Sequence, residues 1–295
     1  MEILKVNELK KHYGSVRALD GISFSVPQGS VFGILGPNGS GKTTLLGIIM
    51  DVLKATSGSY LLFGKAGDAE ARKNIGTLLE TPNFYHYLSA VENLKIVASI
   101  KEKDESDIDR VLNVVNLSER KHYKFSTYSL GMKQRLAIAS ALLGDPKVLV
   151  LDEPTNGLDP SGISETRKLI KELNKLGKTI IMASHLLDEV EKVCTHVAIL
   201  KRGNILAHGS VDELFGANNV IELQAADNNL IIQNLTAMPG FISQNHQDNV
   251  VFVTINPNEI TEEGINKFFF EKGIVLRKIN LKKESLERKF MELTN

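Results

Sequence analysis

The chain has 295 residues, of which 42% are hydrophobic and 24% charged, proportions that are ordinary for a globular protein of one large domain plus a smaller one. Its 35 Lys and Arg side chains are balanced by 35 Asp and Glu side chains. No global positive field therefore draws the chain to nucleic acid, and we expect no nucleic-acid partner.

Neither the start of the chain nor its apolar runs indicate membrane insertion. Met1–Lys5 leads directly into strand-like alternation and lacks the pattern of a secretory signal. The apolar runs, such as Val148–Leu151, have the length of strands and are far shorter than the ~18 residues of a membrane span. The single cysteine, Cys194, cannot form an internal disulfide, which favours a reducing compartment. We therefore expect a soluble chain in the cytoplasm that reaches the membrane only through a partner protein.

The N-terminal part of the chain predicts strands that lead into a glycine-rich loop. Short strands separated by turns are expected over 1–35, and Ser30–Leu35 has the unbroken apolar character of a buried strand. The loop Gly36–Thr43 fits the pattern G-x-x-x-x-G-K-[ST], and the apolar run Thr44–Leu53 predicts the helix that follows it. Strand, loop and helix in this order are the setting that a phosphate-binding loop requires.

The chemistry of this loop indicates a nucleoside triphosphate bound with Mg²⁺. Glycines allow consecutive backbone N–H groups to turn inward around anionic oxygen, and the start of the helix adds its positive end. Lys42 can reach the β- and γ-phosphates, and the hydroxyl of Thr43 can ligate magnesium. The alternative, a glycine-rich turn without a ligand, is disfavoured by the flanking strand and helix. The expected nucleotide-binding residues of the loop are Gly36, Pro37, Asn38, Gly39, Ser40, Gly41, Lys42, Thr43 and Thr44.

Beyond the loop, strands and helices alternate. Strands are expected over 58–63 and 75–80, and helical spacing over 90–143, where Ser106 is the expected cap of a helix that reaches Leu117. Alternating strands and helices then follow over 148–151, 164–176, 179–183, 186–194, 196–200 and 203–209. We expect an α/β fold of the P-loop NTPase type, with a mostly parallel sheet covered on both faces, an antiparallel β portion and a helical subdomain over about 90–143.

A domain boundary near Gly216–Asn219 divides the chain into residues 1–216 and 217–295. The second part predicts the order strand, helix, strand, strand, helix, strand over 219–224, 228–237, 240–245, 249–255, 259–272 and 273–281. This order matches a ferredoxin-like split β-α-β unit, so we expect a small α+β domain, with a last helix over 284–293. No motif for chemistry occurs after residue 209. Two roles stay open for this domain: a packing or dimer-supporting appendage, or a regulatory ligand site.

Two consecutive carboxylates end the apolar run Val148–Leu151. Phosphoryl transfer needs a metal ion that neutralises charge on the β- and γ-oxygens, and a group that orients the attacking water. Asp152 is placed to hold the magnesium shell, and Glu153 can polarise water as a general base. An Asp-Glu pair also begins many solvated loops, but the phosphate-binding loop in the same chain favours the catalytic interpretation.

Together these motifs resemble those of the ATP-binding-cassette (ABC) ATPases, over roughly residues 2–215. Besides the phosphate-binding loop, four stretches carry the resemblance. They are the aromatic Tyr13 before Gly14, the signature-like Tyr128–Leu136, the strand end and D-loop Asp152–Asp159, and the switch-like Ser184–His185. Motifs in the order of the family are far more specific than any one of them alone.

The resemblance implies further roles around the nucleotide. Tyr13 would stack on the adenine, and His185 would form a hydrogen bond to the γ-phosphate. Ser129 and Gly131, at the start of a helix, would offer donors to the nucleotide of a second subunit, and Asp159 of the D-loop would line the nucleotide site. The family therefore implies a head-to-tail dimer, expected here as a homodimer, with two ATP molecules between the subunits.

The sequence departs from the common family pattern at three positions. Leu130 and Met132 replace a Gly and a Gln of the signature, and Glu80 stands where most members have the Q-loop glutamine. A carboxylate at Glu80 can still accept a hydrogen bond from a magnesium-bound water, so we include it in the expected metal shell. The segment Glu80–Leu94 and the added C-terminal domain resemble bacterial cassettes of the bacitracin-resistance and related drug or lipid export type.

The expected function is that of the ATPase subunit of an ABC transporter, peripheral on the inner face of the membrane, which powers a separate permease. The segment near Phe84, Tyr85 and Tyr87 is the expected docking surface. Alternatives are a soluble cassette that acts on ribosomes or DNA, and a regulatory cassette with weak hydrolysis; import in place of export also stays open. A single P-loop without zinc cysteines disfavours the first alternative, and Glu153 and His185 disfavour the second.

Overall fold

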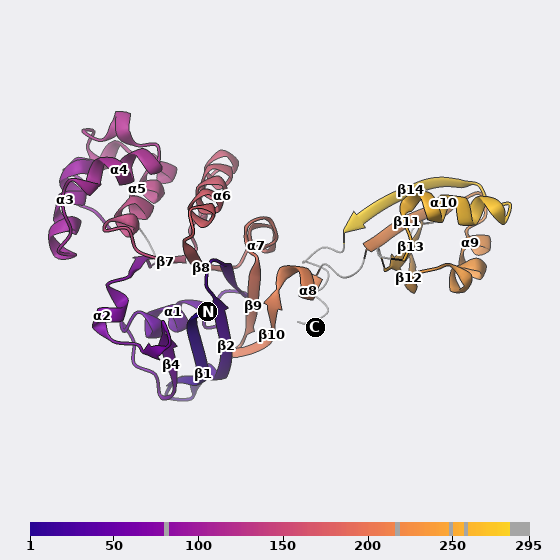
Figure 1. The fold of residues 1–295 in the computed structure, drawn as a ribbon, viewed down its shortest axis with the longest axis horizontal. Helices are drawn as coiled ribbons and strands as arrows, with labels where there is room; N and C mark the ends of the chain where they lie inside the picture. The colour runs from indigo at the N-terminus through magenta and orange to yellow at the C-terminus, as the bar shows by residue number, and fades with distance from the viewer. Residues whose placement is uncertain (80–82, 216–218, 248–249, 257–258, 284–295) are drawn as a thin grey trace. The chain divides into compact units, whose positions relative to one another are not determined.

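The structure is a computed structural model that describes residues 1–79, 83–215, 219–247, 250–256 and 259–283. The chain divides into two units, residues 1–209 and 210–295 (Figure 1). The short helix α8 (Val211–Phe215) belongs to the second unit, so the division comes earlier than the expected boundary after residue 216. No described helix is long and apolar enough to cross a membrane.

A six-stranded sheet forms the centre of the first unit, with the strand order β10-β9-β3-β8-β7-β6. Its strands are β3 (Val31–Leu35), β6 (Ile75–Leu78), β7 (Val148–Asp152), β8 (Thr179–Ser184), β9 (His196–Lys201) and β10 (Asn204–Ser210). The neighbours from β9 to β6 pair in parallel. Every residue of β3, β7 and β8 is buried, which explains their unbroken apolar runs. The expected α/β fold with a mostly parallel sheet is confirmed.

A smaller antiparallel sheet contains β1 (Glu2–Tyr13), β2 (Val16–Pro27), β4 (Ser57–Leu62) and β5 (Lys65–Ala66), in the order β2-β1-β4-β5. Its inner face shares one hydrophobic core with β3, β7 and the helix α1 (Lys42–Ile49). Phe24 of β2, for example, stacks on Phe32 of β3 at 5.5 Å between ring centroids. Residues from both sheets therefore hold α1, whose first residue closes the phosphate-binding loop.

The helical subdomain consists of α3 (Ala90–Ile100), α4 (Asp107–Val114) and α5 (Leu130–Leu142), with 3₁₀ turns at Ser118–Arg120 and Phe125–Thr127. A capping box of Ser89 and Glu92 starts α3. The prediction that the side chain of Ser106 caps the next helix is wrong. Ser106 has helical dihedral angles, and its side chain makes no capping hydrogen bond. Its N–H instead donates to Oδ1 of Asp104, two residues earlier, so the turn before α4 uses an aspartate in place of a serine cap.

Two further helices cover the sheet, α6 (Pro160–Lys175) and α7 (Leu187–Val193), and a short helix α2 (Ala69–Arg72) precedes β6. The expected helix start at residue 164 is late, because Asp159 caps α6 and Pro160 occupies its first position. Proline is favoured there, since its missing N–H would have had no partner within the helix. Gly177 follows the end of α6 with φ 88°, a left-handed conformation that is typical of a glycine that ends a helix.

The second unit contains a four-stranded sheet with its own hydrophobic core. Its elements are β11 (Asn219–Ala225), α9 (Asn228–Asn234), a 3₁₀ turn (Leu235–Ala237), β12 (Phe241–Gln247), β13 (Val250–Ile255), α10 (Glu262–Glu271) and β14 (Leu276–Lys283). The strand order is β12-β13-β11-β14, and all neighbours are antiparallel. The order of elements agrees with the expected one, while the classification as ferredoxin-like stays a prediction. The helix expected over 284–293 lies outside the described residues.

Candidate nucleotide-binding site

Two glycines of the loop after β3, Gly36 and Gly41, are required by close backbone contacts. A Cβ atom at Gly36 would lie 2.2 Å from the carbonyl oxygen of Leu200, and one at Gly41 would lie 2.4 Å from that of Ala18. Gly41 also has φ 111°, in the region that favours glycine. The loop is therefore fixed between β9 and β2, and α1 begins immediately after it, at Lys42. Its backbone is set for an anion at the positive end of α1.

The ammonium group of Lys42 lies inside the loop, and its side chain is only 6% exposed. Nζ donates hydrogen bonds to the carbonyl oxygens of Gly36 at 2.8 Å and Pro37 at 3.3 Å. The same atom lies 3.4 Å from Oε1 of Glu153. Ser40 Oγ, also in the loop, is buried and has no hydrogen-bond partner within the described residues. The ammonium group of Lys42 and the hydroxyl group of Ser40 are hydrogen-bond donors, and the oxygens of a phosphate could accept from both.

Glu153 follows the last residue of β7 and adopts a left-handed backbone conformation, with φ 49°. Such a conformation costs about 1–3 kcal/mol outside glycine and occurs mainly at functional sites. The backbone N–H of Glu153 donates to the carbonyl oxygen of Ala183 at 3.0 Å, which ties the turn to β8. The strained turn directs the carboxylate of Glu153 to Lys42, while Asp152, one residue earlier, stays buried.

His185 lies beside this carboxylate because β7 and β8 are parallel neighbours. Asp152 pairs with Ala183, so the residues that follow the two strands meet at the same edge of the sheet. Nδ1 of His185 lies 2.8 Å from Oε2 of Glu153, within hydrogen-bond distance. One glutamate thus joins the histidine to the lysine of the loop. The sequence identified all three residues but did not show that Glu153 bridges the other two.

The signature-like residues form a separate cluster with the D-loop. Ser129 caps α5 by accepting a hydrogen bond from the N–H of Met132, and Asp159 caps α6 by accepting one from the N–H of Gly162. Ser129, Gly131 and Asp159 line one cavity of about 350 Å³. The structure therefore places Asp159 with the signature-like segment and not beside Lys42. The predicted nucleotide-binding residues fall into two groups within one chain.

Three more residues were expected at the nucleotide site: Tyr13, Thr43 and Glu80. Tyr13 is 47% exposed at the end of β1, and Nζ of Lys11 lies 4.7 Å from the centroid of its ring. Thr43 is exposed in the first turn of α1. Glu80 lies outside the described residues. Within the described part of the chain, no group of three or more His, Cys, Asp and Glu could hold a metal ion by itself.

The profile of the ABC transporter family matches residues 19–156. The bacitracin transport ATP-binding protein BcrA of Bacillus licheniformis is 39% identical, over 99% of this chain and 97% of that protein. The chain belongs to the ABC transporter ATP-binding proteins. The lantibiotic transport ATP-binding protein SrtF of Streptococcus pyogenes is also 39% identical, over 75% of this chain and 95% of its own length.

Solved structures of other ABC proteins match the cassette. The structure of cbiO1 from Clostridium perfringens, part of an ABC transporter complex, matches with 36% identity and a TM-score of 0.66. The match covers 72% of the present chain and 90% of the cbiO1 chain. The dimeric structure of the ATP-binding cassette MJ0796 bound to ADP and Pi matches with 26% identity and a TM-score of 0.63. The match covers 70% of the present chain and 98% of the MJ0796 chain. The expected family, ATP as the nucleotide and the role of a transporter ATPase subunit are confirmed, and the soluble and regulatory alternatives are not favoured.

Sequence reasoning missed an ion-pair network that joins the two helices beside the site of this ABC protein. Nε of Arg167 on α6 donates to Oε2 of Glu189 on α7 at 2.9 Å, and Nη2 of Arg167 donates to Oδ2 of Asp188 at 2.7 Å. The carboxylate of Glu189 is buried, with 2% exposure. These pairings raise the pKa of the Arg167 guanidinium above its usual value, with the hydrogen bond to Glu189 as the largest cause. No motif signals the pair, because its members are far apart in the sequence.

Replacing Arg167 with methionine is expected to lower the free energy of unfolding by about 3–5 kcal/mol, because a buried carboxylate is left without its counter-charge. Chemical denaturation of the full chain measures the change. Arg167→Met combined with Glu189→Gln is the control, and we expect it to be more stable than the single variant. A single variant as stable as the wild type would show that the Arg167–Glu189 pair does not stabilise this interface.

Proposed function

We propose that this chain is the cytoplasmic ATPase subunit of an exporter, that it acts as a homodimer, and that it drives a membrane permease from the inner face of the membrane. The observation that carries the enzymatic part is the contact of Glu153 with both Lys42 and His185 at the phosphate-binding loop. A water-orienting carboxylate, a phosphate-binding ammonium and a second polar group meet there, as hydrolysis of a γ-phosphate requires. Two relatives are named for the transport of bacitracin and of a lantibiotic, and these names support the part of the proposal that concerns transport.

Each residue of the site has a distinct part in this proposal. Lys42 exchanges its carbonyl contacts for the β- and γ-oxygens of ATP. Glu153 accepts a proton from the attacking water, and the hydrogen bond to His185 fixes the orientation of its carboxylate. His185 keeps Nε2 for the γ-phosphate, because Nδ1 faces Glu153. The exposed ring of Tyr13 offers a stacking face to the adenine.

The residues present also fit a magnesium ion. Thr43 supplies a hydroxyl oxygen and Asp152 a carboxylate oxygen, and Mg²⁺ prefers such hard oxygen ligands. Mg²⁺ is commonly held by one or two carboxylates together with substrate phosphates and water, so a cage made by the protein alone is not needed. The ion would neutralise charge on the transferred phosphate.

The two separate groups of nucleotide-binding residues support a head-to-tail dimer. Ser129, Gly131 and Asp159 form a cluster of their own, at the start of two helices. A second copy of the chain in the opposite orientation would place this cluster against the ATP held by Lys42. The dimeric structure of the related cassette MJ0796 supports this arrangement.

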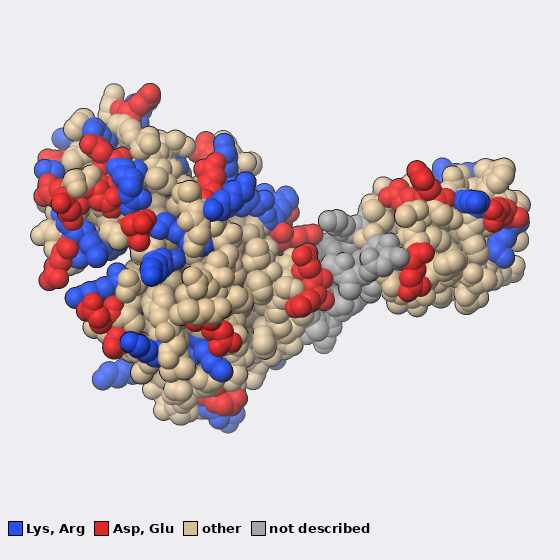
Figure 2. Space-filling view, viewed as in Figure 1, with Lys and Arg blue, Asp and Glu red and all other residues tan. Residues whose placement is uncertain are grey.

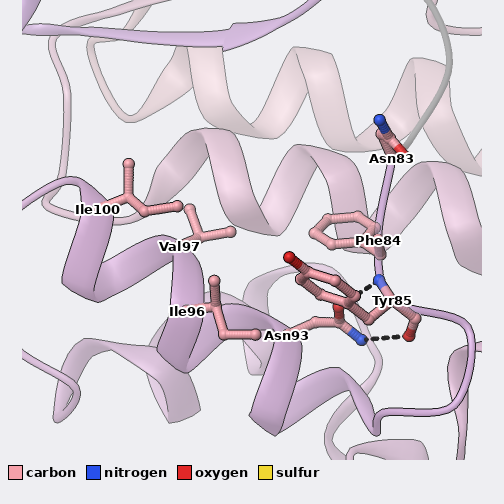
Figure 3. A pocket seen from close by; sticks show the side chains of 7 residues that line it. All are labelled: Asn83, Phe84, Tyr85, Asn93, Ile96, Val97 and Ile100. Carbon is pink, nitrogen blue, oxygen red and sulfur yellow. Dashed lines mark hydrogen bonds between the residues drawn. The ribbon is translucent and has the colours of Figure 1, made fainter.

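A docking groove for the permease lies along α3 (Figure 3). We define the docking groove as the cavity of about 360 Å³ that is lined by Asn83, Phe84, Tyr85, Asn93, Ile96, Val97 and Ile100. Asn93 holds the preceding segment in place, because its side chain accepts from the N–H of Tyr85 at 2.8 Å and donates to the carbonyl oxygen of Tyr85 at 3.1 Å. Tyr85 is 52% exposed and Ile100 is 76% exposed. Exposed apolar side chains on a rigid frame suit an anchor helix of a partner.

The docking proposal is tested by co-expression of the tagged chain with a candidate membrane permease, followed by purification in detergent. Tyr85→Ala together with Ile100→Ser is expected to abolish co-purification, because both apolar anchors are removed. Hydrolysis of ATP by the isolated variant should be unchanged. Tyr123→Ala is the matched control, since Tyr123 is an equally exposed tyrosine of the helical subdomain that does not line the groove. Undiminished co-purification of the double variant would contradict the assignment.

A further inference from the structure

A second cavity lies directly beyond the docking groove, at the end of α3. It has about 440 Å³ and is lined by residues of α2, β6 and the segment that follows α3. Ile100 lines both this cavity and the docking groove, so the two cavities adjoin at this side chain. We call the cavity the basic pocket, because its charged lining residues are Arg72, Lys73, Lys101 and Lys103 against one carboxylate, Glu102. Figure 2 shows Lys and Arg side chains on both sides of the hollow between the regions of α2 and α3, at the left of the view.

The four cations of the basic pocket differ in how well they are neutralised. Nη2 of Arg72 pairs with Oδ2 of Asp51 at 2.7 Å, and Lys73 pairs with Glu70 at 3.1 Å between exposed side chains. Lys101 and Lys103 form no ion pair within the described residues. The pocket therefore has an excess of positive charge next to an apolar groove.

Lys101 and Lys103 repel each other in this pocket. Nζ of Lys101 donates a hydrogen bond to the carbonyl oxygen of Ser140 at 2.7 Å, which uses one of its three N–H donors. Burial lowers the pKa of Lys101 to about 8, and the charge of Lys103 acts in the same direction. The hydrogen bond to Ser140, in the last turn of α5, explains the position of Lys101. It does not explain why a second cation, Lys103, lies beside Lys101. An anion between the two ammonium groups would remove the repulsion.

We propose that the basic pocket receives a carboxylate from the same permease segment that lies in the docking groove. This inference rests on the proposed function and names the chemistry of the partner: an amphipathic helix with apolar anchors followed by an Asp or Glu. The groove runs along α3 from Asn93 to Ile100, about 10 Å at the rise of an α-helix. The acidic residue is therefore expected about one to two turns beyond the apolar anchors, where it meets Lys101 and Lys103.

The adjoining positions of the two cavities favour a protein segment over a lipid headgroup or a free phosphate. A headgroup or a phosphate would need only the cations of the basic pocket. The adjoining apolar groove, with Ile100 shared between the cavities, matches a helix that carries both kinds of side chain. Apolar anchors supply affinity in such interfaces, and a charge pair at one end sets the direction and register of the helix.

Lys103→Glu tests the proposal in the complex that co-purifies with the candidate permease. We expect the affinity for the permease to fall at least about tenfold, because attraction to a carboxylate becomes repulsion. Hydrolysis of ATP by the isolated variant should be unchanged, and so should its thermal unfolding. Lys168→Glu is the matched control, with the same change of charge at an exposed position of α6 that is far along the chain from both cavities. Lys101→Met provides a second variant if Lys103→Glu unfolds.

Restoration of binding by a permease in which the docked acidic residue is changed to lysine, in combination with Lys103→Glu, would support the proposal most directly. Equal permease affinity of Lys103→Glu, Lys101→Met and the wild type would overturn it. Weaker binding of Lys103→Glu to vesicles of phosphatidylglycerol, with unchanged permease binding, would assign the basic pocket to lipid headgroups and would also overturn it. A wild-type chain that does not bind the permease at all would contradict the proposed function itself, which is a different result.

Discussion

Glu153→Gln is expected to retain ATP binding and to lower the turnover number by about 10²- to 10⁴-fold, the usual contribution of a general base. The amide keeps the size of the side chain and can still contact His185, but it cannot accept a proton from water. The left-handed turn that positions residue 153 does not depend on the charge of its side chain. Steady-state phosphate release measures turnover, and calorimetry measures ATP binding.

The matched control for this variant is Glu172→Gln, the same substitution at an exposed position of α6. We expect it to hydrolyse ATP at the wild-type rate. If Glu153→Gln also hydrolysed ATP at that rate, Glu153 would not be the water-orienting group, and the contact with His185 would be a structural one.

Lys42→Ala is expected to raise the dissociation constant of ATP by about 10- to 100-fold, which corresponds to the loss of a charge-assisted hydrogen bond of about 1.5–3 kcal/mol. The buried ammonium group already lies within the loop, so little reorganisation separates its present contacts from those with phosphate. Glu153 would also lose its cationic neighbour. Calorimetric titration with ATP and magnesium measures the change.

Lys171→Ala serves as the control for a general effect of charge, because Lys171 is an exposed lysine of α6. Its affinity for ATP should equal that of the wild type. An unchanged dissociation constant in Lys42→Ala would mean that the loop binds the nucleotide through its backbone alone, against the assigned role of the lysine.

Much of the fold and the chemistry of the site could be predicted because they depend on local sequence. The strands β3, β7 and β8 are buried on both faces and mostly apolar, a pattern that is typical of a parallel sheet covered on both sides. At Gly36 and Gly41 of the loop a Cβ atom would lie less than 3 Å from the backbone of β9 or β2, so no side chain could fit there. Such steric requirements leave a clear signature in the sequence.

The rest depends on contacts between residues that are distant in the chain. The position of His185 against Glu153 follows from the register of β7 and β8, which the two segments do not specify separately. Asp159 belongs to the nucleotide-binding motifs of the family, yet in this chain it caps α6 and lies with Ser129. The basic pocket combines Arg72 with Lys103, which come together only when α2 and the end of α3 meet.

The expected helix starts show how local rules compete. Ser106 is a favoured capping residue, but Asp104 accepts its N–H and the helix begins beyond it. Asp159 followed by Pro160 is an equally favourable sequence for the start of a helix. The apolar periodicity does not detect it, because the first turn of α6 is exposed. Periodicity detects the buried face of a helix and is insensitive to exposed ends.

Calorimetric titration of the purified full-length chain with ATP in the presence of magnesium tests the central claim most directly. The contacts of Lys42 and the turn at Gly41 predict a saturable heat with one ATP per chain, which Lys42→Ala weakens. A correctly folded wild-type chain that gives no heat of binding with ATP and magnesium would contradict the account.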